Sequence, residues 1–154
     1  MHKTIQPVRD LEAIEQELKS SIAGIVSFFS RDEKIIQLAV TFIYLDKNIY
    51  IFLPKDDELF DKINFEIKAN FTLLKNNKPK KVKQFNSISV YNFLSINITG
   101  FIRKIEDQKL ADEMIRQYLV KYKKDNIEEA DTAGLKKIFI IDTEEIQAFE
   151  ETGG

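Results

Sequence analysis

Apolar positions in the first third of the chain follow two spacings, one typical of a helix and one typical of strands. Leu11, Ile14 and Leu18 recur at helical spacing with acidic residues between them, which predicts a first helix over residues 8–19. Apolar, largely β-branched runs then predict strands over residues 22–29, 35–45 and 49–53. Because Asp46-Lys47-Asn48 is a short polar turn, we expect the last two strands to form a hairpin.

Beyond Pro54, which ends the third strand, the pattern predicts both helices and strands. Acidic residues 56–58, followed by apolar Leu59 and Phe60, predict a short helix. The later predictions are a strand over residues 65–74, a mobile loop over 75–84, one long bent strand or two strands over 88–105, a helix over 107–124, an acidic loop over 125–134 and a strand over 137–141. Gly100 indicates a bulge or sharp bend within the long strand. After Asp142, either a short helix or a continued strand fits the sequence.

The number and order of these elements predict a mainly β fold with a few helices. Six or more strands joined largely by hairpins favour an antiparallel β-barrel over a doubly wound sheet. We expect a single domain over residues 1–154, with a helix over 8–19, the main barrel strands over 22–105, a helix over 107–124, and a last strand with a short end segment over 136–150. Phenylalanines on the predicted strands favour core packing over a ligand pocket: Phe28, Phe29, Phe42, Phe52, Phe65 and Phe71.

Composition removes several kinds of chemistry from consideration. The 154 residues include no Cys, which excludes a thiol nucleophile, a disulfide framework and a Cys-based metal site. The one histidine, His2, lies in a terminal segment that we expect to fray, so it is a poor metal ligand or general base. Chemistry must therefore come from carboxylates, lysines, hydroxyls or a bound cofactor.

Charge and apolar runs bear on partners and location. The formal net charge of -2 gives no general attraction to nucleic acid, so we expect no nucleic-acid partner. The lysine-rich stretch over residues 75–83 is better explained as a solubilising loop than as a single-strand binding site. No apolar run approaches the roughly twenty residues that span a bilayer, and the N-terminus lacks a signal-peptide core. We expect a cytoplasmic protein that does not bind membranes.

Three segments carry a resemblance to a known family: Ala39-Val40-Thr41-Phe42-Ile43-Tyr44-Leu45-Asp46, Ile49-Tyr50-Ile51-Phe52 and Gly100-Phe101-Ile102-Arg103-Lys104-Ile105-Glu106-Asp107. They resemble, in order, two consecutive strands and the segment before the late helix of the FMN-binding split β-barrels. That family includes pyridoxamine 5'-phosphate oxidase and its nitroimidazole-resistance and general-stress relatives. The resemblance runs from about Leu11 to Phe149 and implies a split β-barrel.

The resemblance also implies a homodimer that binds FMN at its interface. In such proteins the flavin ring lies against the second and third strands, and the phosphate lies near the loop that follows. By position, the residues beside the ring are Phe52, Leu53 and Pro54. Gln37 and Thr41 would offer hydrogen bonds, and Ser95 corresponds to the serine of a Tyr-Arg-Ser-Val segment.

The chain departs from the family where the phosphate is usually held. Asp57, Glu58 and Leu59 stand where many relatives have Ser followed by Arg or Lys, and carboxylates repel a phosphate. Lys55 and Lys62 flank this group and are the cations expected to compensate. Two functions stay open: a flavin-dependent oxidoreductase acting on an unknown small molecule, or a split barrel that has lost FMN and binds haem, another small ligand or a protein.

Overall fold

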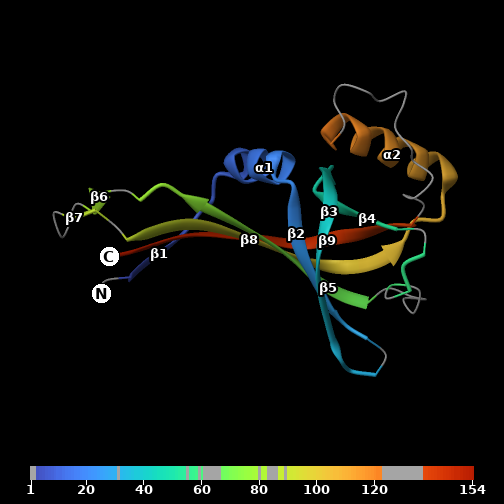
Figure 1. Ribbon diagram of the computed structural model, residues 1–154, viewed down its shortest axis with the longest axis horizontal. Helices are drawn as coiled ribbons and strands as arrows, with labels where there is room; N and C mark the ends of the chain where they lie inside the picture. Colours follow the sequence, from blue (N-terminus) through green and yellow to red (C-terminus); the bar gives the residue numbers. More distant parts are fainter. Residues whose placement is uncertain are drawn as a thin grey trace.

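The computed structural model describes residues 3–30, 32–54, 56–58, 60, 67–79, 81–82, 87–88, 90–122 and 137–154. Their elements are β1 (Lys3–Pro7), α1 (Leu11–Ser20), β2 (Ala23–Phe29), β3 (Ile35–Leu45), β4 (Asn48–Leu53), β5 (Ile67–Asn77), β6 (Lys81–Val82), β7 (Ser87–Ile88), β8 (Tyr91–Lys104), α2 (Gln108–Tyr122) and β9 (Lys137–Gly153) (Figure 1). No helix in this part of the chain is both long enough and apolar enough to cross a membrane.

The main sheet closes on itself as a six-stranded antiparallel barrel. The strands follow the order β9-β4-β3-β2-β5-β8, and β8 also pairs with β9 to complete the circle. β1 pairs with the far half of β9, from Lys3 opposite Gly153 to Pro7 opposite Phe149. The two termini therefore lie together at one end of the molecule (Figure 1). The predicted fold class, a mainly β barrel with a few helices, is confirmed.

Successive side chains along each strand point alternately into the barrel and toward its outer surface. In β2, for example, Val26 and Phe28 are buried, whereas Ile25 and Phe29 are exposed. α1 contributes Ile14 and Leu18 to the interior cluster. The largest fully buried interior side chains are Leu18, Phe42, Ile49, Ile51, Phe60, Phe71, Ile96, Ile98, Ile102, Phe139 and Ile141.

Local sequence accounts for the tightest turn of the barrel. Asp46 and Lys47 have φ values of 51° and 67°, and Leu45 pairs directly with Asn48. Two consecutive positive φ angles in a two-residue loop are the geometry of a type I′ hairpin, whose twist matches that of the strands. The hairpin expected around Asp46 is therefore present, as β3 and β4.

The bend of the long β8–β9 pair depends on a glycine. The register shifts between Thr99 and Gly100, because Thr99 lies opposite Glu145 whereas Gly100 lies opposite Thr143. A Cβ atom on Gly100 would lie 2.0 Å from the backbone oxygen of Asp142. The irregularity that the sequence indicated at Gly100 is a β-bulge at a point where two backbones come too close for a side chain.

Several elements differ in extent from the sequence predictions. The helix begins at Leu11 rather than at residue 8, because the Asp10 carboxylate accepts a hydrogen bond from the N–H of Ala13 at 3.3 Å and caps the helix. Residues 3–7, for which the sequence predicts no helix or strand, form β1 because they pair with the edge of β9. Residues 75–77, expected in a loop, extend β5 because β8 pairs with them as far as Asn92.

The structure also decides between a helix and a strand after Asp142, and it corrects the short helix predicted after β4. β9 continues without a helix to Gly153, because β8 pairs with it on one side and β1 on the other. The described residues 56–58 and 60 are not helical, and the rest of that predicted helix lies outside the described residues. Residues 65–66 and the predicted acidic loop over 125–134 also lie outside them.

Candidate functional site

One part of the outer surface of the barrel is covered by α2. A second apolar cluster lies between them, formed by Ile43, Tyr50, Phe52, Ile105, Met114, Ile138 and Ile140. Phe52 is only 4% exposed, and its ring lies 4.6 Å from that of Tyr118, centroid to centroid. The Thr41 hydroxyl lies 3.4 Å from the Tyr118 hydroxyl. Two of the expected flavin-binding residues, Thr41 and Phe52, are thus brought together beneath this helix.

The last turn of α2 is anchored to the backbone of β3. The Tyr122 hydroxyl accepts a hydrogen bond from the Phe42 N–H at 3.2 Å and lies 2.6 Å from the Ile22 carbonyl oxygen, to which it donates. The Lys121 ammonium group donates to the Phe42 carbonyl at 3.0 Å and lies 3.9 Å from the centre of the Phe42 ring. Burial lowers the pKa of Lys121 to about 8.

This lowered pKa predicts that stability rises with pH in a mildly alkaline window. Between about pH 8 and about pH 9.5 the folded chain releases the Lys121 proton, whereas the unfolded chain, with an ordinary lysine pKa of 10.5, keeps it. The free energy of unfolding should therefore increase, on the order of 1 kcal/mol after allowing for partial exposure of the amine. Urea unfolding at several pH values measures the slope.

Lys121→Met provides the control, because it removes the titrating group while the Tyr122 hydroxyl, 3.0 Å from the Phe42 carbonyl oxygen, stays in place. The increase should disappear in this variant. The window ends near pH 10 because burial raises the pKa of Tyr44 to about 12 and also raises that of Tyr50, so ionisation of these tyrosines favours the unfolded chain. An identical slope in both proteins would contradict the assignment to Lys121.

A second part of the outer surface, which we call the open face, consists of the outward side chains of β2, β5 and β8. No described helix covers it. Register places Ser27 beside Asn70, and Asn70 beside Thr99, in one row across three strands. Asn70 donates a hydrogen bond to the Thr72 hydroxyl at 2.8 Å, and that hydroxyl donates to Asn97 at 2.9 Å. The row is uncharged and partly buried, which suits the recognition of a polar, neutral edge of a ligand.

Large apolar side chains lie exposed beside this polar row. Phe29 is 62% exposed and Ile35 is 68% exposed. Ile25 and Leu74, also outward on β2 and β5, are 42% and 62% exposed. The prediction that Phe29 packs in the core is therefore wrong, because its position in β2 points it away from the interior that Phe28 occupies. Exposed apolar side chains of this size on one face are typical of an interaction surface.

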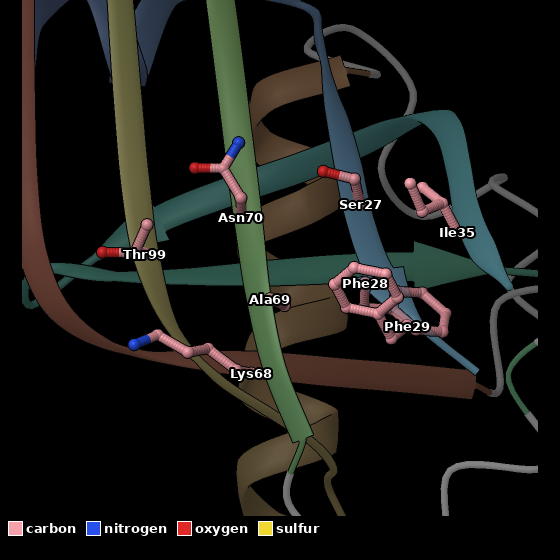
Figure 2. A pocket seen from close by; sticks show the side chains of 8 residues that line it. All are labelled: Ser27, Phe28, Phe29, Ile35, Lys68, Ala69, Asn70 and Thr99. Carbon is pink, nitrogen blue, oxygen red and sulfur yellow. The ribbon is translucent and has the colours of Figure 1, made fainter. Parts of the chain in front are cut away.

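A pocket of about 360 Å³ opens on the open face (Figure 2). It is lined by Ser27, Phe28, Phe29, Ile35, Lys68, Ala69, Asn70 and Thr99. Figure 2 shows Ser27, Asn70 and Thr99 carried by neighbouring strands, with the Lys68 side chain extending toward β8. Among these lining residues Lys68 is the one charged side chain. The pocket combines apolar walls, a few polar groups and one cation, as small-molecule sites commonly do.

The structure does not bring the other expected flavin-binding residues together in one site. Gln37 is exposed on β3 and pairs with Ser27, which puts it next to the pocket. Ser95 lies on β8, opposite Leu74 of β5. Leu53 belongs to the interior cluster, and Pro54 is exposed after β4. Lys55 and Lys62 lie outside the described residues.

The pocket residues Ser27, Asn70, Thr99 and Lys68 were not identified from the sequence. A signal was present, because polar residues alternate with buried apolar ones in β5 and β8, and Ser27 lies between buried Val26 and Phe28 in β2. Which polar positions become neighbours depends on the register between strands distant in sequence, and this register is not readable from any one strand.

The segment after β4 that carries Asp57 and Glu58, which we call the acidic loop after β4, contacts β2 near Phe28. The Phe60 ring packs against Phe28, with centroids 5.0 Å apart, and against Phe139 at the same distance. The Asp57 carboxylate accepts a hydrogen bond from the Phe60 N–H at 3.1 Å. Glu58 is exposed. In the described part of the chain, no group of three or more acidic or histidine side chains is placed to hold a metal ion.

Comparison with known proteins places the fold. The chain is similar to a candidate 5-nitroimidazole antibiotic resistance protein from Bacteroides thetaiotaomicron, with a TM-score of 0.75 and 16% identity over 99% of this chain and 90% of the other. It is also similar to a candidate pyridoxamine 5'-phosphate oxidase from Corynebacterium glutamicum, with a TM-score of 0.62 and 16% identity over 100% and 98% of the two chains. The fold is the split β-barrel of pyridoxamine 5'-phosphate oxidase-like proteins.

The chain is also similar to an FAD binding protein from Mycobacterium smegmatis, with a TM-score of 0.63 and 13% identity over 96% of this chain and 98% of the other. No protein-family model matches the sequence, and no curated protein matches it. At these identities the structural likeness establishes the fold of this chain and leaves its ligand to be argued from the site.

Proposed function

We propose that this protein binds a flavin, FMN, on the open face at the interface of a homodimer. The observation that carries the proposal is the pocket beside the row Ser27, Asn70 and Thr99, with exposed Phe29 and Ile35 as apolar walls. A flavin ring has flat apolar faces and a polar edge, which these walls and this row match. Similarity to an FAD binding protein supports a flavin as the ligand class.

The residues of the pocket fit such a group. Its volume of about 360 Å³ lies within the range typical of small-molecule sites, and a second protomer would enlarge and cover it. Gln37, beside Ser27, is placed to add a hydrogen bond, as the family resemblance implies. Lys68 lines the pocket and offers a positive charge for a phosphate. Lys55 and Lys62 remain the other cations that we expect to bind the phosphate.

The chemistry would come from the bound flavin, which supplies electron and hydride transfer. The chain itself would bind the ring, orient it and exclude water from one side. Thr41 and Phe52, which Tyr118 covers beneath α2, do not line this pocket, so the proposed site does not use them. An oxidoreductase activity on a small molecule is the function that follows if the flavin is retained. The alternative is a barrel without flavin that uses the same face for another ligand or a protein.

Flavin binding is tested by an absorption spectrum of the concentrated protein and by titration with FMN and FAD. We expect flavin bands, or quenching of flavin fluorescence on titration, with FMN bound at least as tightly as FAD. Phe29→Ser should weaken FMN binding about tenfold, because it removes an aromatic contact without opening the core. Val120→Ser, which changes another exposed apolar residue, on α2, is the matched control and should leave binding unchanged.

Three results would count against the proposal. The first is the lack of any flavin binding, the second is a Soret band of haem in place of flavin bands, and the third is equal weakening by both variants. Tighter binding of FAD would correct the choice of flavin and retain the site.

The exposed apolar side chains of the open face also predict that the protein forms a dimer. Ile25, Phe29, Ile35 and Leu74 expose apolar area on one side of the barrel, and symmetric pairing would bury it twice. Sedimentation velocity at micromolar concentration should show a dimer. Ile25→Lys should shift it to the monomer, because each dimer would then bury two charges, whereas Val120→Lys should not. A wild-type protein that sediments only as a monomer would remove the basis for an interfacial site.

A further inference from the structure

A second hollow lies where the chain passes from β1 into α1 and runs alongside β9. Its volume is about 380 Å³, and it shares no lining residue with the pocket on the open face. Apolar walls come from both sides, with Leu11 and Ile14 on α1 and Ile146 and Phe149 on β9. Leu11 is 41% exposed, so a large apolar side chain borders the hollow without being covered. We name this hollow the α1–β9 groove.

The edge of β9 is unpaired where it borders the groove. β4 pairs with β9 only as far as Ile141, and β1 begins to pair at Phe149. The Val8 N–H donates to the Ala148 carbonyl at 2.8 Å, so the carbonyl of Ala148 faces this side. In a regular strand the N–H and C=O of the residue two positions away point to the same side, which places those of Ile146 toward the groove.

Among the described residues none pairs with those two groups of Ile146, and the backbone hydrogen bonds on this side of β9 end at Ala148. A backbone donor and acceptor that lie beside apolar walls gain from a polar partner, because leaving them unpaired and partly desolvated is costly. The groove therefore has a polar strip along one wall.

Charge at the groove favours an anion. Arg9 lines it, and none of the described lining residues is acidic. The Asp10 carboxylate, next in sequence, is engaged in capping α1 through the Ala13 N–H. The guanidinium group of arginine presents paired N–H donors that match the two oxygens of a carboxylate.

We propose that the α1–β9 groove binds a small carboxylic acid with an apolar body. The carboxylate accepts hydrogen bonds from Arg9, and the apolar body packs between Leu11, Ile14 and Ile146. Two sources share this chemistry, a simple medium-chain acid and an acid derived from an amino acid, whose amide would also pair with the Ile146 backbone. This binding is separate from the flavin on the open face, and neither proposal depends on the other.

The test is a titration of the intact, ¹⁵N-labelled protein with octanoate and with N-acetyl-leucine, followed by amide chemical shifts and by calorimetry. We expect millimolar or tighter binding of at least one acid, with the largest shifts at Ile146, Ala148 and Leu11. Arg9→Gln should weaken binding about tenfold, as expected for loss of a charge-assisted hydrogen bond at a partly exposed site. Arg9→Lys should restore part of the affinity.

Matched controls separate this result from general adhesion. Octanol has the same apolar chain without the charge and should bind at least about tenfold more weakly than octanoate. Arg116→Gln removes an exposed arginine from α2 and should have no effect. Tighter binding of octanoate identifies simple acids, and tighter binding of N-acetyl-leucine identifies amino-acid derivatives; either supports the proposal. Binding of neither acid, equal binding of octanol, or shifts confined to the open face would overturn it.

Discussion

Gly100→Ala is expected to lower the free energy of unfolding by about 3 kcal/mol, one of the largest effects of any single methyl group in this chain. The added Cβ would lie 2.0 Å from the backbone oxygen of Asp142 and 2.8 Å from its carbonyl carbon. Both are main-chain atoms of β9, so relief requires the β8–β9 pair to separate. That pair closes the barrel, and its displacement would disturb the interior on both sides.

Urea denaturation followed by circular dichroism measures this effect, with Ser95→Ala as the matched control on the same strand. Ser95 is only partly buried and makes no described side-chain hydrogen bond, so its replacement should change stability by less than about 0.5 kcal/mol. Gly100→Ala with the stability of the wild type would show that the bulge can widen freely. The bend in β8 and β9 would then need another explanation.

The sequence predicts those elements of this fold that depend on local chemistry. The β3–β4 hairpin is an example, because Asp46 and Lys47 alone set the turn and the turn sets the register. The strand that β9 forms beyond Asp142 is a counterexample. Its residues fit a short helix or a strand equally well, and only β8 and β1, distant in sequence, decide between them.

The candidate site is less predictable for the same reason. Phe29 is apolar and lies on a strand, yet it is exposed because its neighbour Phe28 takes the interior position. Thr41 and Phe52 lie on adjacent strands as expected, but their outward side chains are covered by Tyr118. Contact between a strand and a helix that follows it by more than sixty residues is a property of the whole chain, so the sequence of β3 and β4 gives no indication of it.

The acidic loop after β4 carries Asp57 and Glu58, which replace the residues that usually hold the phosphate in the family. Phe60 holds the loop against Phe28, and Phe28 lines the pocket on the open face. As the family resemblance implies, we expect the phosphate of a flavin in that pocket to lie near the segment over residues 56–60. Asp57 and Glu58 add negative charge there, and Lys68 adds one positive charge from the pocket itself. The expected consequence is weak binding of FMN relative to a flavin without a phosphate.

Replacing Asp57 with Ser and Glu58 with Arg should accordingly tighten FMN about tenfold or more relative to riboflavin, which lacks the phosphate. The Asp57 side chain caps the Phe60 N–H at 3.1 Å, and a serine hydroxyl can accept the same hydrogen bond, so the loop should keep its conformation. The new arginine at the exposed position 58 offers a charge-assisted hydrogen bond to the phosphate, worth about 1.5 to 3 kcal/mol.

The quantity to measure is the ratio of the FMN and riboflavin dissociation constants, because effects on the ring cancel in it. Asp112→Ser with Glu106→Arg makes the same change in net charge at the start of α2 and is the control for long-range attraction. Both positions are exposed.

If long-range charge alone acts on the phosphate, the two double variants should move the ratio equally, and added salt should abolish the difference from the wild type. If the phosphate lies at the loop, only the first variant should move it substantially. An unchanged ratio in that variant would show that the phosphate does not approach residues 57 and 58, and the flavin would then have to lie across the open face with its phosphate directed toward Lys68.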